Sequence, residues 1–129
     1  MTEFSEQKFK NTLSRFATGV CVITTKDEHG ISQGITINSF VSVSLEPPLV
    51  LFCLEKKAHR HVFFEQSNYF CINILSREQE HISALFTRTF TGSWQDVSLQ
   101  NKTDFPRILK DTCGYIMCTK DTLVEAGDH

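Results

Sequence analysis

Apolar and polar residues alternate along the central stretch of the chain, residues 34–54, which reads GITINSFVSVSLEPPLVLFCL. Between Ile35 and Leu45 the apolar positions are separated by Thr36, Ser42 and Ser44, a period of two that is typical of a strand with one buried face. These polar residues carry short hydroxyl groups, which suit close approach to a polar ligand. A sheet edge rich in Ser and Thr gives the same alternation, so the pattern alone leaves both interpretations open.

The N-terminal residues 4–16 have the spacing of an amphipathic helix. Ser5 is suited to cap it, and Phe4 and Phe9 are placed as a hydrophobic staple. Phe9, Leu13 and Phe16 then fall on one face of the helix.

The segments on either side of the central stretch predict further strands and short helices. Residues 20–25 are rich in β-branched side chains, and residues 26–30 form a turn in which Gly30 is free to adopt positive φ, so residues 31–37 should return as the partner strand. After Pro47 and Pro48, which cannot occupy a ladder interior, the apolar run 49–54 predicts a strand covered on both faces. The remaining expected elements are a helix over 58–66, a strand over 69–75, a helix opened by a capping box of Ser76 and Gln79, a long loop over 87–106, and strands over 113–119 and 123–126.

Several strands with short connections and only peripheral helices predict a mainly β protein, a small antiparallel barrel rather than a parallel sheet. The length of 129 residues fits one domain covering the whole chain. The chain ends directly after an expected strand, and a closed barrel would need another. The sequence therefore predicts a single domain that lacks one or more C-terminal strands.

Composition narrows the class of protein. With 40% hydrophobic and 22% charged residues and a net charge of −2, the chain is typical of a soluble globular domain and lacks the basic surface of a nucleic-acid-binding protein. No apolar stretch has the length of a signal peptide or membrane span, which favours the cytoplasm. The five cysteines lie in apolar runs without a C-x-x-C spacing, so we expect buried free thiols.

Most catalytic and metal-binding motifs are absent. The sequence contains no G-x-S-x-G, P-loop, H-E-x-x-H or G-x-G-x-x-G pattern, and His59 and His61 alone do not predict a metal site. What remains is a set of uncharged hydrogen-bonding groups, with cations at Lys56, Lys57, Arg60 and Arg88. That combination suits a ligand with a flat, hydrogen-bonding head and a phosphate tail. Flavin mononucleotide meets this description and carries its own reactive chemistry.

Four segments resemble a known family: RFATGVCVITT (15–25), the central stretch, FCINILSREQEHISALF (70–86) and EAGDH (125–129). In the central stretch the run T-x-N-S-F-x-S-V-S-x-x-P-P-L is the most specific. Together they resemble the flavin reductase family of the FMN-binding split-barrel fold, the reductase partners of two-component flavin monooxygenases. The resemblance implies a Greek-key split β-barrel and a homodimer with flavin near the subunit interface. It also implies that relatives continue beyond Gly-Asp-His with a strand and more.

The same resemblance assigns roles to particular residues. It implies that the isoalloxazine ring is lined by Thr36, Asn38, Ser39 and Phe40, with Ile37 where relatives have a smaller alanine, and that Ser42 and Ser44 extend this wall. The ribityl phosphate would meet the segment 53–60, in particular Cys53, Leu54, Lys57, Ala58 and Arg60, together with Phe86 and Arg88. His129 corresponds to a histidine near the flavin and the nicotinamide.

The leading hypothesis is therefore an NAD(P)H:flavin oxidoreductase that passes hydride from NADH or NADPH to FMN or FAD and supplies reduced flavin to a monooxygenase. One alternative is a flavin-binding protein without turnover, such as a carrier, a sensor or a truncated relic. A further alternative is an oxidase of the pyridoxamine-phosphate type, which would need a substrate-phosphate site that the sequence does not locate. The choice of nicotinamide and of flavin stays open at this stage.

Overall fold

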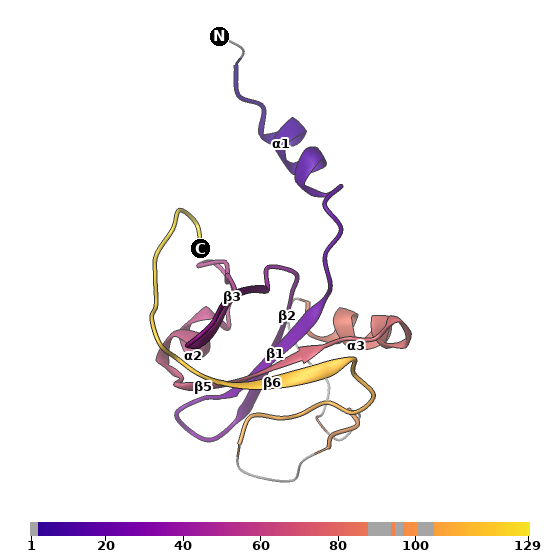
Figure 1. The fold of residues 1–129 in the computed structure, drawn as a ribbon, viewed down its shortest axis with the longest axis vertical. Helices are drawn as coiled ribbons and strands as arrows, with labels where there is room; N and C mark the ends of the chain where they lie inside the picture. The colour runs from indigo at the N-terminus through magenta and orange to yellow at the C-terminus, as the bar shows by residue number, and fades with distance from the viewer. Residues whose placement is uncertain (1–2, 88–93, 95–96, 101–104) are drawn as a thin grey trace.

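The computed structural model describes residues 3–87, 94, 97–100 and 105–129. The chain is mainly β with a few short helices, as the sequence predicts (Figure 1). In order, the elements are α1 (Glu6–Leu13), β1 (Cys21–Lys26), β2 (Ser32–Ile37), β3 (Val41–Leu45), β4 (Pro48–Leu51), α2 (His61–Gln66), β5 (Tyr69–Ile74), the 3-10 helix η1 (Arg77–Gln79), α3 (Glu80–Leu85) and β6 (Gly114–Thr119).

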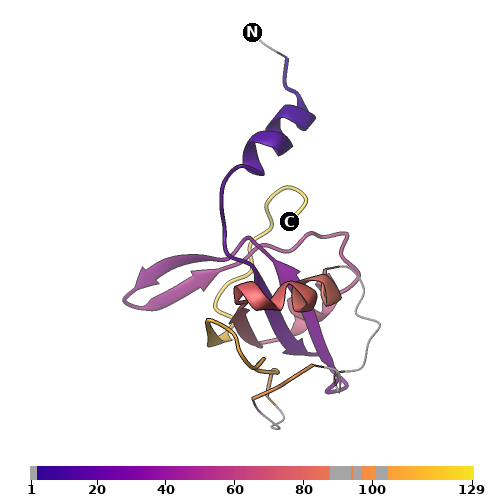
Figure 2. The same ribbon diagram turned by 90° about the vertical axis from the view of Figure 1, so that its right-hand side faces the viewer.

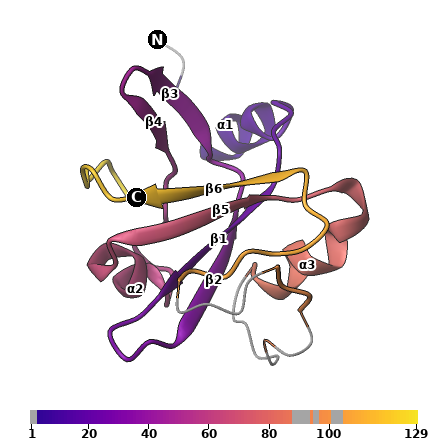
Figure 3. The ribbon, with the colours of Figure 1, turned by 60° about the horizontal axis from the view of Figure 1, so that its bottom comes forward.

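Four strands form one antiparallel sheet in the order β2-β1-β5-β6, visible side by side in Figure 3. The predicted hairpin of β1 and β2 is confirmed, with Cys21 opposite Ile37 and Lys26 opposite Ser32. Its turn is fixed by the carboxylate of Asp27, which accepts hydrogen bonds from the backbone N–H groups of His29 and Ile31, both at 2.9 Å. Gly30 takes the expected positive φ, at 76°.

Alternation along β1 divides the core between the two faces of this sheet. On one face, α2 covers a cluster of Cys21, Ile23, Ile35, Ile37, Phe64, Phe70 and Ile72. On the other face, α3 and the segment before β6 contribute to a cluster of Val22, Ile82, Phe86, Val97 and Leu109. The predicted capping box is present at the start of η1, where Ser76 N–H donates to Gln79 Oε1 at 3.0 Å.

Two buried polar side chains, those of Asn73 and Thr24, hold the segment before β6 against the sheet. Asn73 on β5 is fully buried, donates to Val22 O at 3.0 Å and accepts from Leu109 N–H at 2.9 Å. Thr24 on β1 donates to Arg107 O at 2.6 Å. Because buried polar groups are costly unless paired, these bonds specify where the segment docks.

The central stretch is not one strand but the end of β2, a bend, and a separate hairpin of β3 and β4. The β3–β4 hairpin extends from the body of the molecule (Figure 2). The expectation that the run 49–54 is covered on both faces is wrong for this chain, because Leu51 is exposed and Leu49 only half-buried. The prolines lie as expected: the turn holds Pro47, and β4 begins at Pro48.

Two further expectations need correction. Residues 123–126 do not form a strand, because after β6 the chain leaves the sheet and runs exposed to its end. Of the five thiols, all free, Cys21 and Cys71 are buried as predicted, whereas Cys53 and Cys113 are exposed and Cys118 is intermediate. Among the described residues, no helix has the length and apolar character needed to cross a membrane.

The predicted N-terminal helix forms over the shorter range Glu6–Leu13, which leaves Phe16 outside it, and it does not pack on the rest of the chain. Ser5 caps it by accepting a hydrogen bond from Lys8 N–H, and the rings of Phe4 and Phe9 lie 5.7 Å apart. None of its residues is buried, and both Figure 1 and Figure 2 show α1 extending away from the sheets.

Candidate functional site

One part of the candidate site is formed where the end of α3 contacts β2. Thr36 on β2 donates its backbone N–H to Phe86 O at 3.0 Å and its hydroxyl to Ser83 O at 2.7 Å. The ring of Phe86 packs against Gly34, where an added Cβ would lie 2.7 Å from two ring carbons. These contacts fix the C-terminal end of α3 over β2, so the residues on both sides of the junction hold a defined position.

Arg60, at the N-terminal end of α2, reaches the same strand. Its side chain is buried, with 7% of the residue exposed, and its Nη1 donates to Gly34 O. The other terminal nitrogen, Nη2, is also buried and has no hydrogen-bond partner among the described residues. Burial lowers the pKa of this guanidinium, since removal from water disfavours the charged form. A buried guanidinium N–H that lacks a partner can donate a charge-assisted hydrogen bond to an anion.

A cavity of about 340 Å³ lies at this junction. It brings together three of the predicted phosphate-site residues, Lys57, Ala58 and Arg60. Sequence reasoning missed its other lining residues, which are Ile35, Glu55, His59 and Thr87. Of these, Glu55 and His59 lie within the predicted segment, and Thr87 lies between the predicted Phe86 and Arg88. Arg88 itself is outside the residues that the structure describes.

The predicted ring-binding residues lie on the segment that leads from β2 into the hairpin. Ser39 joins the two ends of that hairpin, because its hydroxyl both donates to Cys53 O and accepts from Cys53 N–H at 2.9 Å. Asn38 is exposed at the bend, and Ser42 and Ser44 follow on β3. The apolar members Ile37 and Phe40 pack in or against the core cluster covered by α2, and so does Leu54 of the predicted phosphate segment. None of these residues lines the 340 Å³ cavity.

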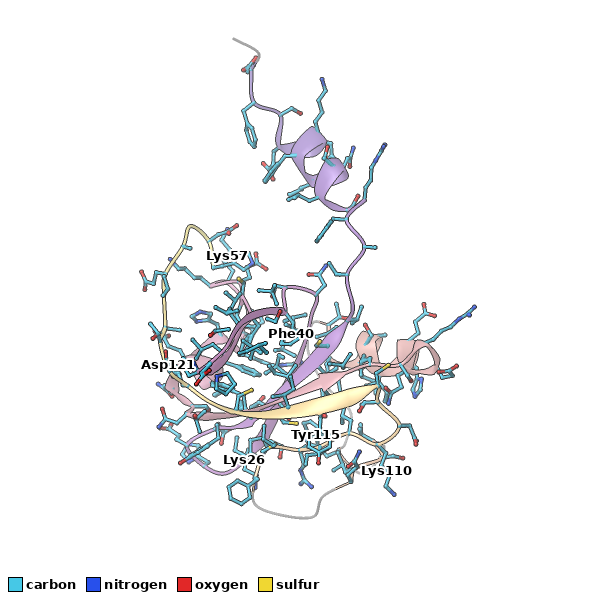
Figure 4. The ribbon with its side chains drawn as sticks, viewed as in Figure 1. Lys26, Phe40, Lys57, Lys110, Tyr115 and Asp121 are labelled. Atoms are coloured by element: carbon cyan, nitrogen blue, oxygen red, sulfur yellow. The ribbon has the colours of Figure 1, made fainter. Side chains whose placement is uncertain are left out.

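The C-terminal segment returns to the residues beside the cavity. Lys56 donates its backbone N–H to Asp128 O at 2.8 Å, and in Figure 4 its neighbour Lys57 lies at the same end of the molecule as this segment. His129 Nδ1 lies 2.6 Å from Asp128 Oδ1. That hydrogen bond, with the attraction between the two charges, holds the pKa of Asp128 below its usual value. The predicted residue His129 is therefore connected through its own turn to the segment that lines the cavity.

A larger cavity of about 430 Å³ lies at η1, α3 and the segment before β6. It contains none of the predicted site residues. Within the described part of the chain, no group of three or more His, Cys, Asp or Glu side chains is placed to hold a metal ion.

A family model and the similar proteins both connect this chain with flavin reductases. Residues 13–129 match the family described as "Flavin reductase like domain". The chain is 36% identical over 125 residues to "FMN reductase (NADH) SmoA" of Agrobacterium fabrum, covering 97% of this chain and 71% of that protein. It is 34% identical over 123 residues to "Flavin-dependent monooxygenase, reductase subunit HsaB" of Rhodococcus jostii, covering 95% of this chain and 63% of that protein.

Solved structures show the same fold. The NADH:FAD oxidoreductase SgcE6 of Streptomyces globisporus C-1027, solved in complex with NAD and FAD fragments, superposes with a TM-score of 0.83 at 30% identity, covering 99% of this chain and 79% of that one. The split-barrel architecture expected from the sequence is thereby confirmed. The chain spans 40% of the length of a "Probable flavin reductase" of Rhizobium meliloti and 72% of the length of a "Flavin reductase" of Pseudomonas putida.

Proposed function

This chain belongs to the family of flavin reductase like domains, and we propose that it acts as an NAD(P)H:flavin oxidoreductase. The names of the similar proteins support this reaction, since one is an FMN reductase that uses NADH and another an NADH:FAD oxidoreductase. FMN or FAD as the flavin and NADH or NADPH as the hydride donor form part of the proposal. The fold that this chain shares with that NADH:FAD oxidoreductase would hold the proposed site residues in place.

The observation that carries the proposal is the orphaned Nη2 of Arg60. A flavin phosphate in the 340 Å³ cavity would give this buried nitrogen the charged acceptor that it lacks, and Lys57 at the cavity wall adds a second positive charge. Glu55 also lines the cavity, and its carboxylate would repel an anion placed beside it. We therefore assign the phosphate to the side of the cavity formed by Arg60 and Lys57.

The residues from Thr36 to Ser44 are assigned to the ring system. Asn38 is exposed at the bend, which leaves its amide accessible to a hydrogen-bonding edge of a ligand. Ser39 holds the two ends of the hairpin together through Cys53, so it positions this segment as well as bordering it. When bound, the flavin supplies the redox chemistry by accepting hydride from the nicotinamide. The protein's part is to bind and orient both rings, with His129 on the nicotinamide side.

The test is anaerobic reduction. Purified protein with FMN is mixed with NADH, and in a parallel sample with NADPH, while the visible flavin absorbance is followed. Protein-dependent bleaching supports the reductase and identifies the preferred nicotinamide. Bound flavin without protein-dependent bleaching would contradict the proposal and favour a carrier or sensor.

We further propose that the working molecule is a homodimer in the cytoplasm. The support for the dimer is the apolar surface that this chain leaves exposed on α1 and on the β3–β4 hairpin, where the Phe16 residue after the helix is 78% exposed and Leu45 is 95% exposed. A second copy would remove such surface from water. Five free thiols are in keeping with a reducing compartment.

A monooxygenase partner is also part of the proposal. It is supported by HsaB of Rhodococcus jostii, which is named as the reductase subunit of a flavin-dependent monooxygenase. A coupled assay would combine the protein, NADH and FMN with a candidate oxygenase and measure hydroxylated product.

A further inference from the structure

Lys56 makes three contacts with the C-terminal segment. Its backbone N–H donates to Asp128 O at 2.8 Å, its Nζ donates to Gly127 O at 2.9 Å, and the same Nζ lies 3.8 Å from Glu125 Oε2. An ammonium group has three donors that it can direct to separate acceptors, so one lysine can hold several points of a turn.

The segment that Lys56 holds is itself a closed turn. Ala126 and His129 exchange backbone hydrogen bonds of 3.1 and 3.2 Å, and Gly127 between them has a φ of 64°, which glycine adopts without strain. His129 and Asp128 are joined by their side chains as well. Holding the carbonyls of this turn therefore holds His129 with them.

Lys56 also has a fixed place relative to the cavity, because Glu55 and Lys57, the residues on either side of it, both line the cavity wall. Lys56 itself does not line the cavity, and its side chain is used on the C-terminal turn. The residue thus connects the wall of the candidate flavin site with the turn that carries His129.

We propose that Lys56 is a positioning residue that docks the Gly127–His129 turn beside the cavity and so sets where His129 meets the nicotinamide. This inference rests on the proposed reductase function. With the carboxylate of Asp128 ionised, Nδ1 of His129 is the hydrogen-bond donor to it, and Nε2 is the ring nitrogen left for the nicotinamide side. Lys56 acts on the ligand only through this turn.

The docking is tested first without any ligand or turnover, by hydrogen exchange measured by mass spectrometry on the full chain. Lys56→Gln removes the ammonium but keeps the backbone N–H, and we expect the peptide that contains Glu125–His129 to exchange at least several-fold faster than in the wild type. Lys120→Gln is the matched control, since Lys120 Nζ also donates to a backbone carbonyl, that of Glu65. Unchanged exchange of the C-terminal peptide in Lys56→Gln would overturn the proposal.

Steady-state kinetics then test whether Lys56 affects nicotinamide binding by positioning His129. We expect Lys56→Gln to raise the KM for NADH about tenfold, the effect of losing one charge-assisted hydrogen bond, with the Kd for FMN unchanged. Lys56→Arg, which keeps the charge and the donors, should restore most of the loss. In a His129→Gln background the same Lys56→Gln change should alter KM less than twofold, because coupled residues are not additive.

Two outcomes of the kinetics would overturn the proposal. One is an equal effect of Lys56→Gln with and without His129, and the other is a weaker FMN affinity that accounts for the whole loss, which would make Lys56 a phosphate-binding charge. A wild-type protein with no NADH oxidation would instead contradict the proposed function, and the exchange experiment would still decide whether Lys56 docks the turn.

Discussion

At the scale of single residues, the proposed phosphate site depends most on Arg60. Its guanidinium is buried, one nitrogen is bonded to Gly34 O, and the other is unpaired within the described chain. A buried donor without a partner is costly to the folded protein, and an anion that reaches it repays part of that cost. Ligand binding and local stability at this residue should therefore be linked.

Arg60→Met tests this role. Loss of a charged hydrogen bond worth about 1.5–3 kcal/mol should weaken FMN binding about 10- to 150-fold. Riboflavin, which has the same ring but no phosphate, should bind the variant and the wild type equally in a fluorescence titration. An equal loss of affinity for both flavins would assign Arg60 to the ring or to the fold.

Asn38 is the residue we expect to matter for the ring. In Asn38→Ala the flavin affinity should fall by about 1–3 kcal/mol, because a buried polar group of the bound flavin would lose its partner. The amide is exposed at a bend, so the variant should keep the wild-type circular dichroism spectrum and melting temperature. An unchanged flavin Kd in a folded variant would count against this placement.

The thiols differ in environment and should differ in reactivity. Burial raises the pKa of Cys71 to about 12, and its thiolate is therefore scarce at neutral pH. In native protein at pH 8, Ellman's reagent should label the exposed Cys53 and Cys113 and leave Cys71 unlabelled until unfolding. In the unfolded chain the Cys71 thiol loses its proton near pH 9, whereas in the folded protein it keeps the proton up to about pH 12. The contribution of Cys71 to the free energy of unfolding is therefore fully present below pH 9 and declines as the pH rises from 9 towards 12. Rapid labelling of Cys71 in folded protein would contradict this.

At the scale of elements, the contact between β2 and α3 depends on a missing side chain. A Cβ on Gly34 would lie 2.7 Å from ring carbons of Phe86 and 3.4 Å from Trp94. Gly34→Ala should therefore destabilise the protein by about 1–3 kcal/mol, as overpacking does, and should also displace the cavity wall. Gly114→Ala is the control, because nothing lies within 4 Å of the added carbon. Chemical denaturation measures both, and equal midpoints would contradict the packing argument.

Local sequence predicts an element well when the residues within that element determine its structure. The hairpin of β1 and β2 follows from the turn at Gly30, and η1 begins where the Ser76–Gln79 capping box places it. The expected burial of both faces of the run 49–54 is wrong because a continuous apolar pattern does not show which elements cover a strand. In this structure the first residues of the run belong to β4, which pairs only with β3 in a hairpin that projects from the molecule. Residues 123–126 have strand composition, but they are exposed and pair with no strand in the described part of the chain.

The same reasoning explains how much of the site could be predicted. Segment 55–60 is contiguous, so one charged stretch identifies Lys57, Ala58 and Arg60 together. Ile35 and Thr87 join the cavity only through tertiary packing of α3 on β2, which no local pattern encodes. Thr36 has the hydroxyl expected of a ligand contact, yet its proton is donated to Ser83 O. The composition of a polar face therefore predicts hydrogen bonding without predicting the partner.

At the scale of the whole molecule, the chain leaves apolar side chains on two projecting elements. Phe9 and Leu13 of α1 are each more than half exposed, although the helix spacing places them on one face. Val43 and Leu45 of the hairpin are exposed as well. Helix α1 extends away from the four-stranded sheet in both views, and the hairpin does so in Figure 2, although Val50 of β4 still packs against the core cluster (Figures 1 and 2).

A second copy of the chain is the occupant that we propose for these surfaces, and Leu13→Asp tests it. A charge on the apolar face of α1 must be desolvated in the interface but stays in water in the monomer, so the variant should shift the protein from dimer towards monomer. Sedimentation velocity should show a mass about twice that of one chain for the wild type and for Thr12→Asp, which places the same charge at the neighbouring position on the helix. Because α1 makes no buried contact with its own chain, the monomeric variant should keep a folded sheet. A dimer unaffected by Leu13→Asp would place the interface elsewhere, and a wild-type monomer would contradict the dimer itself.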